Sequence, residues 1–244
     1  MTPRPLRRHR DPRDRAAVDM EVVVARYAEE VNWTRKLPPG VRVTIYDKRG
    51  DLSAARFPYA QVIALPNVGL EAHSYLEHIL ARGDRPADVT LFCQGHPFDH
   101  AHDLHAVARE VAAGAPLADG FRWLGHIVDT DDCRGRRLFT RWSKNRDQRE
   151  LAVDRFHEEL LGEPCPPLVH FRPGAQFAVA AARLRSRPRA FWERARELAL
   201  AFPDAGHCFE RLWDRVFGVR AVDPASLGPD GCLYLKPIRR LQKT

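Results

Sequence analysis

"LEAHSYLEHILARGDRPADVTLFCQG", residues 70–95, joins a helix pattern to a strand pattern, and this pairing decides the fold class. Gly83 ends a periodic run whose apolar residues fall on one helical face: Ala72, Leu76, Ile79 and Leu80. The second half, "ADVTLFCQG" (87–95), is a short apolar run typical of a buried strand. A helix that leads directly into a strand is characteristic of α/β proteins, so we predict that class.

Two strand patterns lie upstream of this helix. "MEVVVARY" (20–27) and "VRVTIYDK" (41–48) are rich in β-branched residues, and "FPYAQVIALPN" (57–67) ends in a Pro-Asn turn before the helix. The order strand, strand, helix, strand with short connections predicts a central, mostly parallel sheet with helices on both faces. We expect one Rossmann-like domain over residues 20–222.

Composition places the chain among globular proteins. It has 244 residues, 44% of them hydrophobic, and no apolar run approaches the roughly 18 residues that a membrane helix needs. The N-terminus lacks the apolar region of a signal peptide. Five widely spaced cysteines without a CxxC pair indicate no disulfide framework, so we expect a cytoplasmic protein without a transmembrane segment. The sequence does not predict an oligomeric state.

The net charge of +7 belongs to the two ends of the chain. Residues 1–15 hold six arginines against two aspartates, and residues 234–244 hold four lysines and arginines, so the body carries about −1. We interpret residues 1–19 as a basic tail and 223–244 as a basic C-terminal extension. Because the domain itself is nearly neutral, specific nucleic-acid binding is not predicted.

Polar residues cluster where the predicted strands end. They are Arg26, Tyr27, Asp47, Lys48, Asn67, Gly69, Gln94, His96 and Asp99. Ligands of open α/β sheets bind at the carboxyl ends of the strands, so these residues predict one pocket. Carboxylates and amides would bind a base and a sugar, while Arg26, Lys48 and the first-turn amides of the helix would bind phosphates. The alternative is that strand ends are polar only because loops lie at the surface.

The same stretches carry a resemblance. "NVGLEAHSYLEHILARGDRPADVTLFCQGHPFD" (67–99) is similar to the segment of inverting GT-A glycosyltransferases in which an Asn-x-Gly turn opens a helix and the next strand ends in an acidic metal motif. Six segments more closely resemble the family known as domain of unknown function 3431, across about residues 20–220: "VVVARYAEEVNW", "VTIYDK", "LPNVGLEAHSYL", "QGHPFDH", "GAQFAV" and "ERLWDRVFG". The GT-A resemblance implies a GT-A-like domain, a nucleotide-sugar donor, a hydroxyl acceptor and Mg²⁺ or Mn²⁺.

The sequence departs from GT-A enzymes at the metal motif. Gln94, Gly95 and His96 replace the Asp-x-Asp, and Asp99 follows three residues later. Mg²⁺ prefers oxygen ligands, whereas His96 with Asp99 could hold Mn²⁺, or protonated His96 could itself supply the positive charge. A literal Asp-x-Asp, Asp129 and Asp131, stands in "VDTDDCRG" (128–135), which we interpret as an exposed acidic turn.

The histidines of "QGHPFDHAHDLH" (94–105) suggest a rival function. A metal-dependent hydrolase would use His96, Asp99, His100 and His102 as a cluster. Pro97 interrupts the first histidine pair, and the second pair begins a helix, so we expect His96 and Asp99 inside the pocket and His102 outside. A binding module without catalysis is the remaining alternative.

The C-terminal half supplies the predicted catalytic residues. "CFERLWDRVF" (208–217) places an apolar stripe on one helical face: Phe209, Leu212, Trp213, Val216 and Phe217. Glu210 and Asp214 lie one turn apart beside it, and the GT-A resemblance implies that Glu210 is the base that deprotonates the acceptor. A solvated helix face is the alternative. Upstream, we expect Gln176 to bind a sugar, and we interpret "RRLFTRWSKNRDQRE" (136–150) as a helix or lid at the surface.

Overall fold

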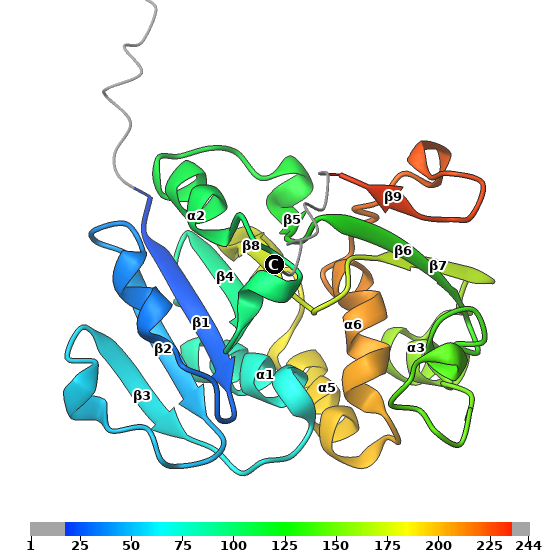
Figure 1. The fold of residues 1–244 in the computed structure, drawn as a ribbon, viewed down its shortest axis with the longest axis horizontal. Coiled ribbons are helices and arrows are strands. Elements are labelled where there is room, and N and C mark those ends of the chain that lie inside the picture. Colours follow the sequence, from blue (N-terminus) through cyan, green and yellow to red (C-terminus); the bar gives the residue numbers. More distant parts are fainter. Residues whose placement is uncertain (1–17, 236–244) are drawn as a thin grey trace, which may run out of the picture.

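A computed structural model describes residues 18–235. The strands are β1 (Met20–Arg26), β2 (Arg42–Asp47), β3 (Ala60–Ala64), β4 (Val89–Gln94), β5 (Phe121–Trp123), β6 (Ile127–Asp132), β7 (Leu168–Phe171), β8 (Phe177–Ala180) and β9 (Leu233–Tyr234). The helices are α1 (Leu70–Arg82), α2 (Leu104–Ala112), α3 (Val153–Leu161), α4 (Ala181–Leu184), α5 (Arg189–Ala201) and α6 (Ala205–Val216) (Figure 1). The predictions for basic residues 1–17 and 236–244 lie outside the described residues.

A six-stranded, mostly parallel sheet forms the centre of the molecule, in the order β3-β2-β1-β4-β8-β5. β1 pairs in parallel with both β2 and β4, and β2 pairs in parallel with β3. β8 runs antiparallel to β4 and to β5. The predicted α/β class and mostly parallel sheet are thereby confirmed. The chain moves outward from β1 to β3 and then returns to the other side of β1, so a topological switch point lies between β1 and β4.

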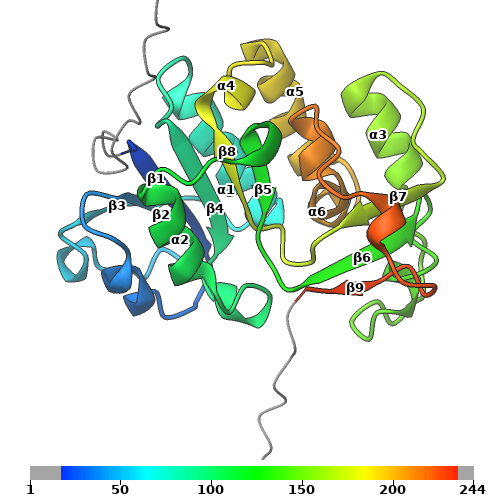
Figure 2. The ribbon, with the colours of Figure 1, turned by 90° about the horizontal axis from the view of Figure 1, so that it is seen from above.

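Helices cover both faces of this sheet, because buried strand residues alternate between two cores. Val23 and Phe92 belong to the core beneath α1, α5 and α6, while Val22 and Leu91 belong to the core beneath α2. Figure 2 shows α2 and α5 on opposite sides of the central strands. Fully buried strands of this kind read as continuous apolar runs, which is the pattern from which they were predicted.

A smaller antiparallel sheet, in the order β7-β6-β9, lies beyond β5 and packs against α6. β9 pairs with β6 through Ile127 opposite Tyr234 and Val128 opposite Leu233. The ordered fold therefore continues past the boundary predicted at residue 222. Strand β9 has two residues and pairs only with β6 in this sheet, so its sequence pattern is too short to distinguish from a loop.

Helix α6 joins the two sheets and places Glu210. The predicted apolar stripe is fully buried, and Phe209 stacks on Trp213 with ring centroids 4.9 Å apart. α6 contacts α1, α3, α5 and β7. A helix surrounded in this way has little freedom to shift, so its polar residues have fixed positions.

Residues 18–235 include no helix that is long and apolar enough to span a bilayer.

Candidate functional site

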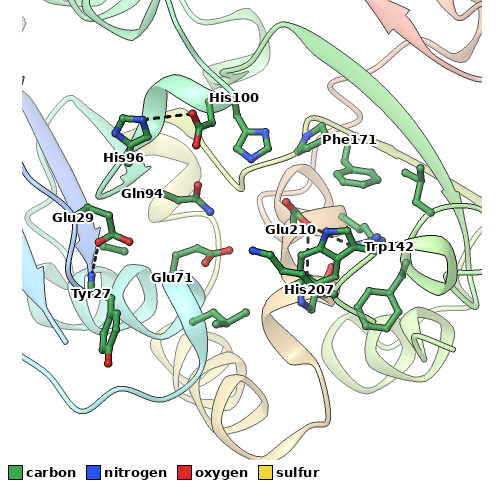
Figure 3. Close-up of a pocket in the computed structure, with 18 of the residues that line it drawn as sticks. Tyr27, Glu29, Glu71, Gln94, His96, His100, Trp142, Phe171, His207 and Glu210 are labelled. Carbon is green, nitrogen blue, oxygen red and sulfur yellow. Dashed lines mark hydrogen bonds and ion pairs between the residues drawn. The ribbon is translucent and has the colours of Figure 1, made fainter. Parts of the chain in front are cut away.

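A cavity of about 1040 Å³ opens at the switch point, where β1 and β4 end. Two walls enclose it (Figure 3). The sheet wall consists of Arg26, Tyr27, Glu29, Lys48, Asn67, Glu71, Gln94, His96, Asp99 and His100. The loop wall comes from the loop after β6, the end of β7 and helix α6, and it includes Arg137, Phe139, Arg141, Trp142, Lys144, Phe171, His207, Glu210 and Arg211. Open α/β sheets bind ligands at this position.

Lys48 fixes the turn that begins α1. Its ammonium group donates hydrogen bonds to the carbonyl oxygens of Val68 and Leu70, and burial lowers the pKa of Lys48 to about 8. Gly69, in the left-handed conformation at φ +61°, makes the turn tight enough for this contact. The first turn of α1 thus faces the cavity beside a buried cation.

Glu71 and Glu210 enter the cavity from opposite walls, and both are labelled in Figure 3. Burial, and then the negative charge of Glu210, raise the pKa of Glu71 to about 7. Burial also opposes ionisation of Glu210. However, interactions with His207 and Arg211, together with a 2.7 Å hydrogen bond from the Gly174 amide, outweigh burial and lower its pKa. One carboxyl group can therefore hold a proton at neutral pH while the other accepts one.

The histidines of residues 96–105 point in different directions. His96 lies at the cavity rim, with Nε2 3.5 Å from Oδ1 of Asp99, and both side chains are more than half exposed. His100 lines the cavity, whereas the His102 ring packs on His126 and Nε2 of His105 is 3.0 Å from the carbonyl oxygen of Trp33. Across residues 18–235, no three histidine, cysteine or acidic side chains are grouped to hold a metal ion. The cluster that the hydrolase would require is not assembled.

Asp47 was predicted to line the pocket but lies beneath it. Its carboxylate accepts a 2.6 Å hydrogen bond from Nη1 of Arg26 and further bonds from the amides of Arg49 and Leu52. Arg26 lines the cavity, but Asp47 and Asp51 neutralise its guanidinium. The guanidinium of Arg26 therefore reaches the cavity already paired, and these ion pairs hold the loop after β2. Its contact with a phosphate stays a prediction.

Three more predicted site residues lie outside the cavity. Gly69 shapes the turn before α1 without lining the pocket. Gln176 is fully buried and donates a 3.0 Å hydrogen bond to the Pro97 carbonyl. Asp214 accepts hydrogen bonds from the amides of Arg215 and Ala221, and burial raises its pKa to about 6. Its carboxylate holds the turn after α6 and does not share a pocket wall with Glu210.

The loop wall was missed by sequence reasoning. Residues 136–150, expected to form a surface helix or lid, form a loop with one 3₁₀ turn at Phe139–Arg141. Five of their polar or aromatic side chains line the cavity: Arg137, Phe139, Arg141, Trp142 and Lys144. Asp131 is fully buried at the end of β6 and is not part of an exposed turn. Asp129 accepts a hydrogen bond from Cys232 and does not line the cavity. The available signal was the apolar run before Asp131, which is typical of a strand.

Among known proteins, the similarity is to a family defined by sequence. No curated protein matches this chain. A family model described as "Protein of unknown function (DUF3431)" matches residues 22–228, which cover the central sheet, the cavity and α6. The chain therefore belongs to the DUF3431 family.

Proposed function

We propose that this protein transfers a glycosyl unit from a nucleoside diphospho-sugar to a hydroxyl group of an acceptor. The observation that carries the proposal is the pair Glu71 and Glu210, two carboxyl groups whose pKa values are shifted in opposite directions, in a cavity at the switch point of the sheet. The resemblance of residues 67–99 to GT-A glycosyltransferases supports the same reaction class.

In this proposal the donor occupies the sheet wall. The Tyr27 ring, 49% exposed, offers a surface for the base, and Asn67 and Gln94 offer hydrogen bonds to the base and ribose. The diphosphate lies against Lys48 and the first-turn amides of α1, where the helix dipole favours negative charge. These groups stabilise the charge that develops on the leaving diphosphate oxygen.

Glu210 acts as the base. Because its pKa is lowered, it is ionised at neutral pH and can take the proton from the acceptor hydroxyl. The hydroxyl oxygen then bonds to the anomeric carbon while the bond to the diphosphate oxygen breaks, and the electron pair leaves with the nucleoside diphosphate. Glu71, with a pKa near 7, holds a proton and can donate a hydrogen bond to the sugar.

The residues at the rim supply few ligands for a metal ion. His96 and Asp99 provide one imidazole and one carboxylate, and within residues 18–235 no third acidic, histidine or cysteine ligand joins them. Mg²⁺ is usually bound through one or two carboxylates together with substrate phosphates and water, and Asp99 is the single carboxylate of this pair. We therefore assign no step of the transfer to a metal.

Thermal denaturation in the presence of nucleotides tests the proposal. One of UDP, GDP or ADP, with or without Mn²⁺, should raise the melting temperature according to RT ln(1 + [L]/Kd). Lys48→Met should remove the shift, whereas Lys36→Met, an exposed lysine outside the cavity, should preserve it. Circular dichroism verifies that each variant is folded. Absence of any response at millimolar nucleotide would contradict the proposal.

A second variant separates transfer from simple binding. Glu210→Gln should bind the nucleotide with nearly unchanged affinity but lose turnover of the donor, because only the base is removed. Equal turnover in Glu210→Gln and the natural protein would exclude Glu210 as the base.

A further inference from the structure

The two walls of the cavity differ in charge. The sheet wall carries three acidic side chains, Glu29, Glu71 and Asp99, of which Glu71 has a raised pKa. Within residues 18–235, Lys48 of this wall forms no ion pair with a carboxylate. The loop wall carries four cations, Arg137, Arg141, Lys144 and Arg211, of which Arg211 is paired with the buried carboxylate of Asp131. Its one carboxylate, Glu210, is already engaged by Arg211 and the Gly174 amide. A ligand that spans the cavity therefore meets positive charge at the end farther from β1.

Three of the four cations of the loop wall are not neutralised by the protein. Within residues 18–235, Arg137, Arg141 and Lys144 form no ion pair with a carboxylate, and Nη2 of Arg137 donates to the carbonyl oxygen of Asp230 at 2.9 Å. Three other arginines of the same loop are paired, and Arg146 lies outside the cavity. Arg134 and Arg136 bind Glu150, and Arg149 binds Asp204. The unpaired charge thus faces the cavity, where a ligand can reach it.

The backbone that carries these cations is held firmly. The buried carboxylate of Asp131 accepts hydrogen bonds from the amides of Arg137, Leu138 and Phe139, at 3.1 to 3.3 Å. The side-chain amide of buried Asn145 donates to the carbonyl oxygens of Phe139 and Arg149. A fixed backbone lowers the entropy lost when the side chains close on a ligand.

Trp142 lines the same wall of the cavity as Arg137, Arg141 and Lys144. Its side chain is 41% exposed, although it lines the cavity, and Nζ of Lys144 lies 5.5 Å from the ring centroid. The His207 ring meets it edge-on at 5.0 Å, and Figure 3 shows both residues beside Glu210. An exposed indole held next to a carboxylate base offers a flat apolar surface for the body of a substrate.

We propose that the acceptor is an anion: a hydroxylated molecule whose phosphate or carboxylate group binds Arg137, Arg141 and Lys144 and whose body packs on Trp142. This inference rests on the proposed transfer, since it assigns the second substrate of the same cavity. Arginine binds both oxyanions through paired hydrogen bonds, and a substrate held in this way brings its hydroxyl to Glu210 on the same wall. The donor diphosphate stays with Lys48 on the opposite wall.

Calorimetric titration with three probes tests the charge requirement. Glucose 6-phosphate, glucuronate and glucose share a hydroxylated ring but differ in charge, and we expect the first or second to bind while glucose does not. The preferred anion identifies phosphate or carboxylate as the recognised group. Binding should weaken as salt concentration rises. Equal binding of glucose and the two anions would overturn the proposal, as would failure of both anions to bind in the presence and absence of nucleotide.

A double variant tests the location. Arg141→Ala with Lys144→Ala should weaken anion binding about tenfold or more, because two charge-assisted contacts are lost. The matched control, Arg146→Ala with Arg155→Ala, removes two exposed arginines outside the cavity and should leave affinity unchanged. If the first variant instead abolished nucleoside diphosphate binding, the loop cations would serve the donor and the proposal would be wrong.

The two proposals can fail separately. If no nucleoside diphosphate binds but the anionic probes bind and depend on Arg141 and Lys144, the transferase function is contradicted while the anion site stands. If nucleoside diphosphate binds and the anionic probes do not, the donor site stands and the anionic acceptor is contradicted.

Discussion

Arg211 on α6 and Asp131 at the end of β6 form a buried ion pair, with Nε and Nη2 of Arg211 2.9 and 2.8 Å from Oδ2 of Asp131. Both side chains are at most 4% exposed. The pair joins the small sheet to the helix that carries Glu210. Since Asp131 also binds the backbone of the loop wall, one carboxylate sets the position of that loop relative to the catalytic candidate.

Asp131→Ala should strongly destabilise the protein. It leaves the Arg211 guanidinium buried without its main partner, which typically costs about 3–5 kcal/mol in the free energy of unfolding. Urea denaturation provides the measurement. Asp129→Ala is the matched control, because its half-buried carboxylate accepts a bond from Cys232 and has no arginine partner among residues 18–235. Similar losses in the two variants would contradict the structural role of Asp131.

Glu71 should make stability depend on pH. Its pKa is raised from 4.5 in a free side chain to about 7 in the fold, so the folded state binds the proton more tightly than the unfolded state. Stability contributed by this group is complete below pH 4.5 and is lost as the pH rises to 7. Glu71→Gln should therefore raise the free energy of unfolding at pH 8 by at most about 3 kcal/mol and have little effect at pH 4.

Urea midpoints measured from pH 4 to pH 8 check this difference. Glu158→Gln, at an exposed position on α3, is the control and should follow the natural protein at every pH. A constant difference between Glu71→Gln and the natural protein across the range would argue against a raised pKa.

Gly69→Ala should destabilise the fold more than Gly50→Ala. Both glycines have positive φ, +61° and +74°, so each substitution brings a backbone cost of about 1–2 kcal/mol. A Cβ at position 69 would also lie 2.8 Å from the carbonyl oxygen of Ala199, whereas nothing lies within 4 Å at position 50. Thermal or urea unfolding should show the extra loss at position 69. Equal losses would mean that α1 and α5 separate easily.

His96→Ala and Asp99→Ala should lower turnover of the donor without unfolding the protein, because both side chains line the wall that the donor occupies in the proposal. Their side chains are 54% and 77% exposed at the cavity rim, so little packing is lost. His102→Ala, whose ring packs on His126 away from the cavity, should retain turnover within about twofold of the natural protein. An assay of donor consumption with circular dichroism as the folding control decides the matter. Loss of activity in His102→Ala alone would revive the histidine-cluster hypothesis.

Local periodicity was enough to predict the main strands and helices. Apolar β-branched runs identified β1, β2 and β4, the stripe ending at Gly83 identified α1, and the stripe of 209–217 identified α6. Because parallel strands end at one edge of a sheet, the sequence also placed Lys48, Gln94 and His96 near one another. These inferences needed only neighbouring residues, since backbone period and side-chain polarity are local properties.

Which charges face the cavity depends on contacts between segments that are distant in the sequence. Asp131 is separated from Arg211 by 80 residues and Asp47 from Arg26 by 21, so no local pattern distinguishes these buried, paired groups from exposed acidic turns or free ligands. The same holds for Arg137, Arg141 and Lys144, whose sequence pattern is that of an ordinary charged loop. The fold places them around the same cavity as Glu71 and Glu210. Whether a charge is neutralised or available depends on the partners that the fold brings to it, because electrostatic pairing acts through space and not along the chain.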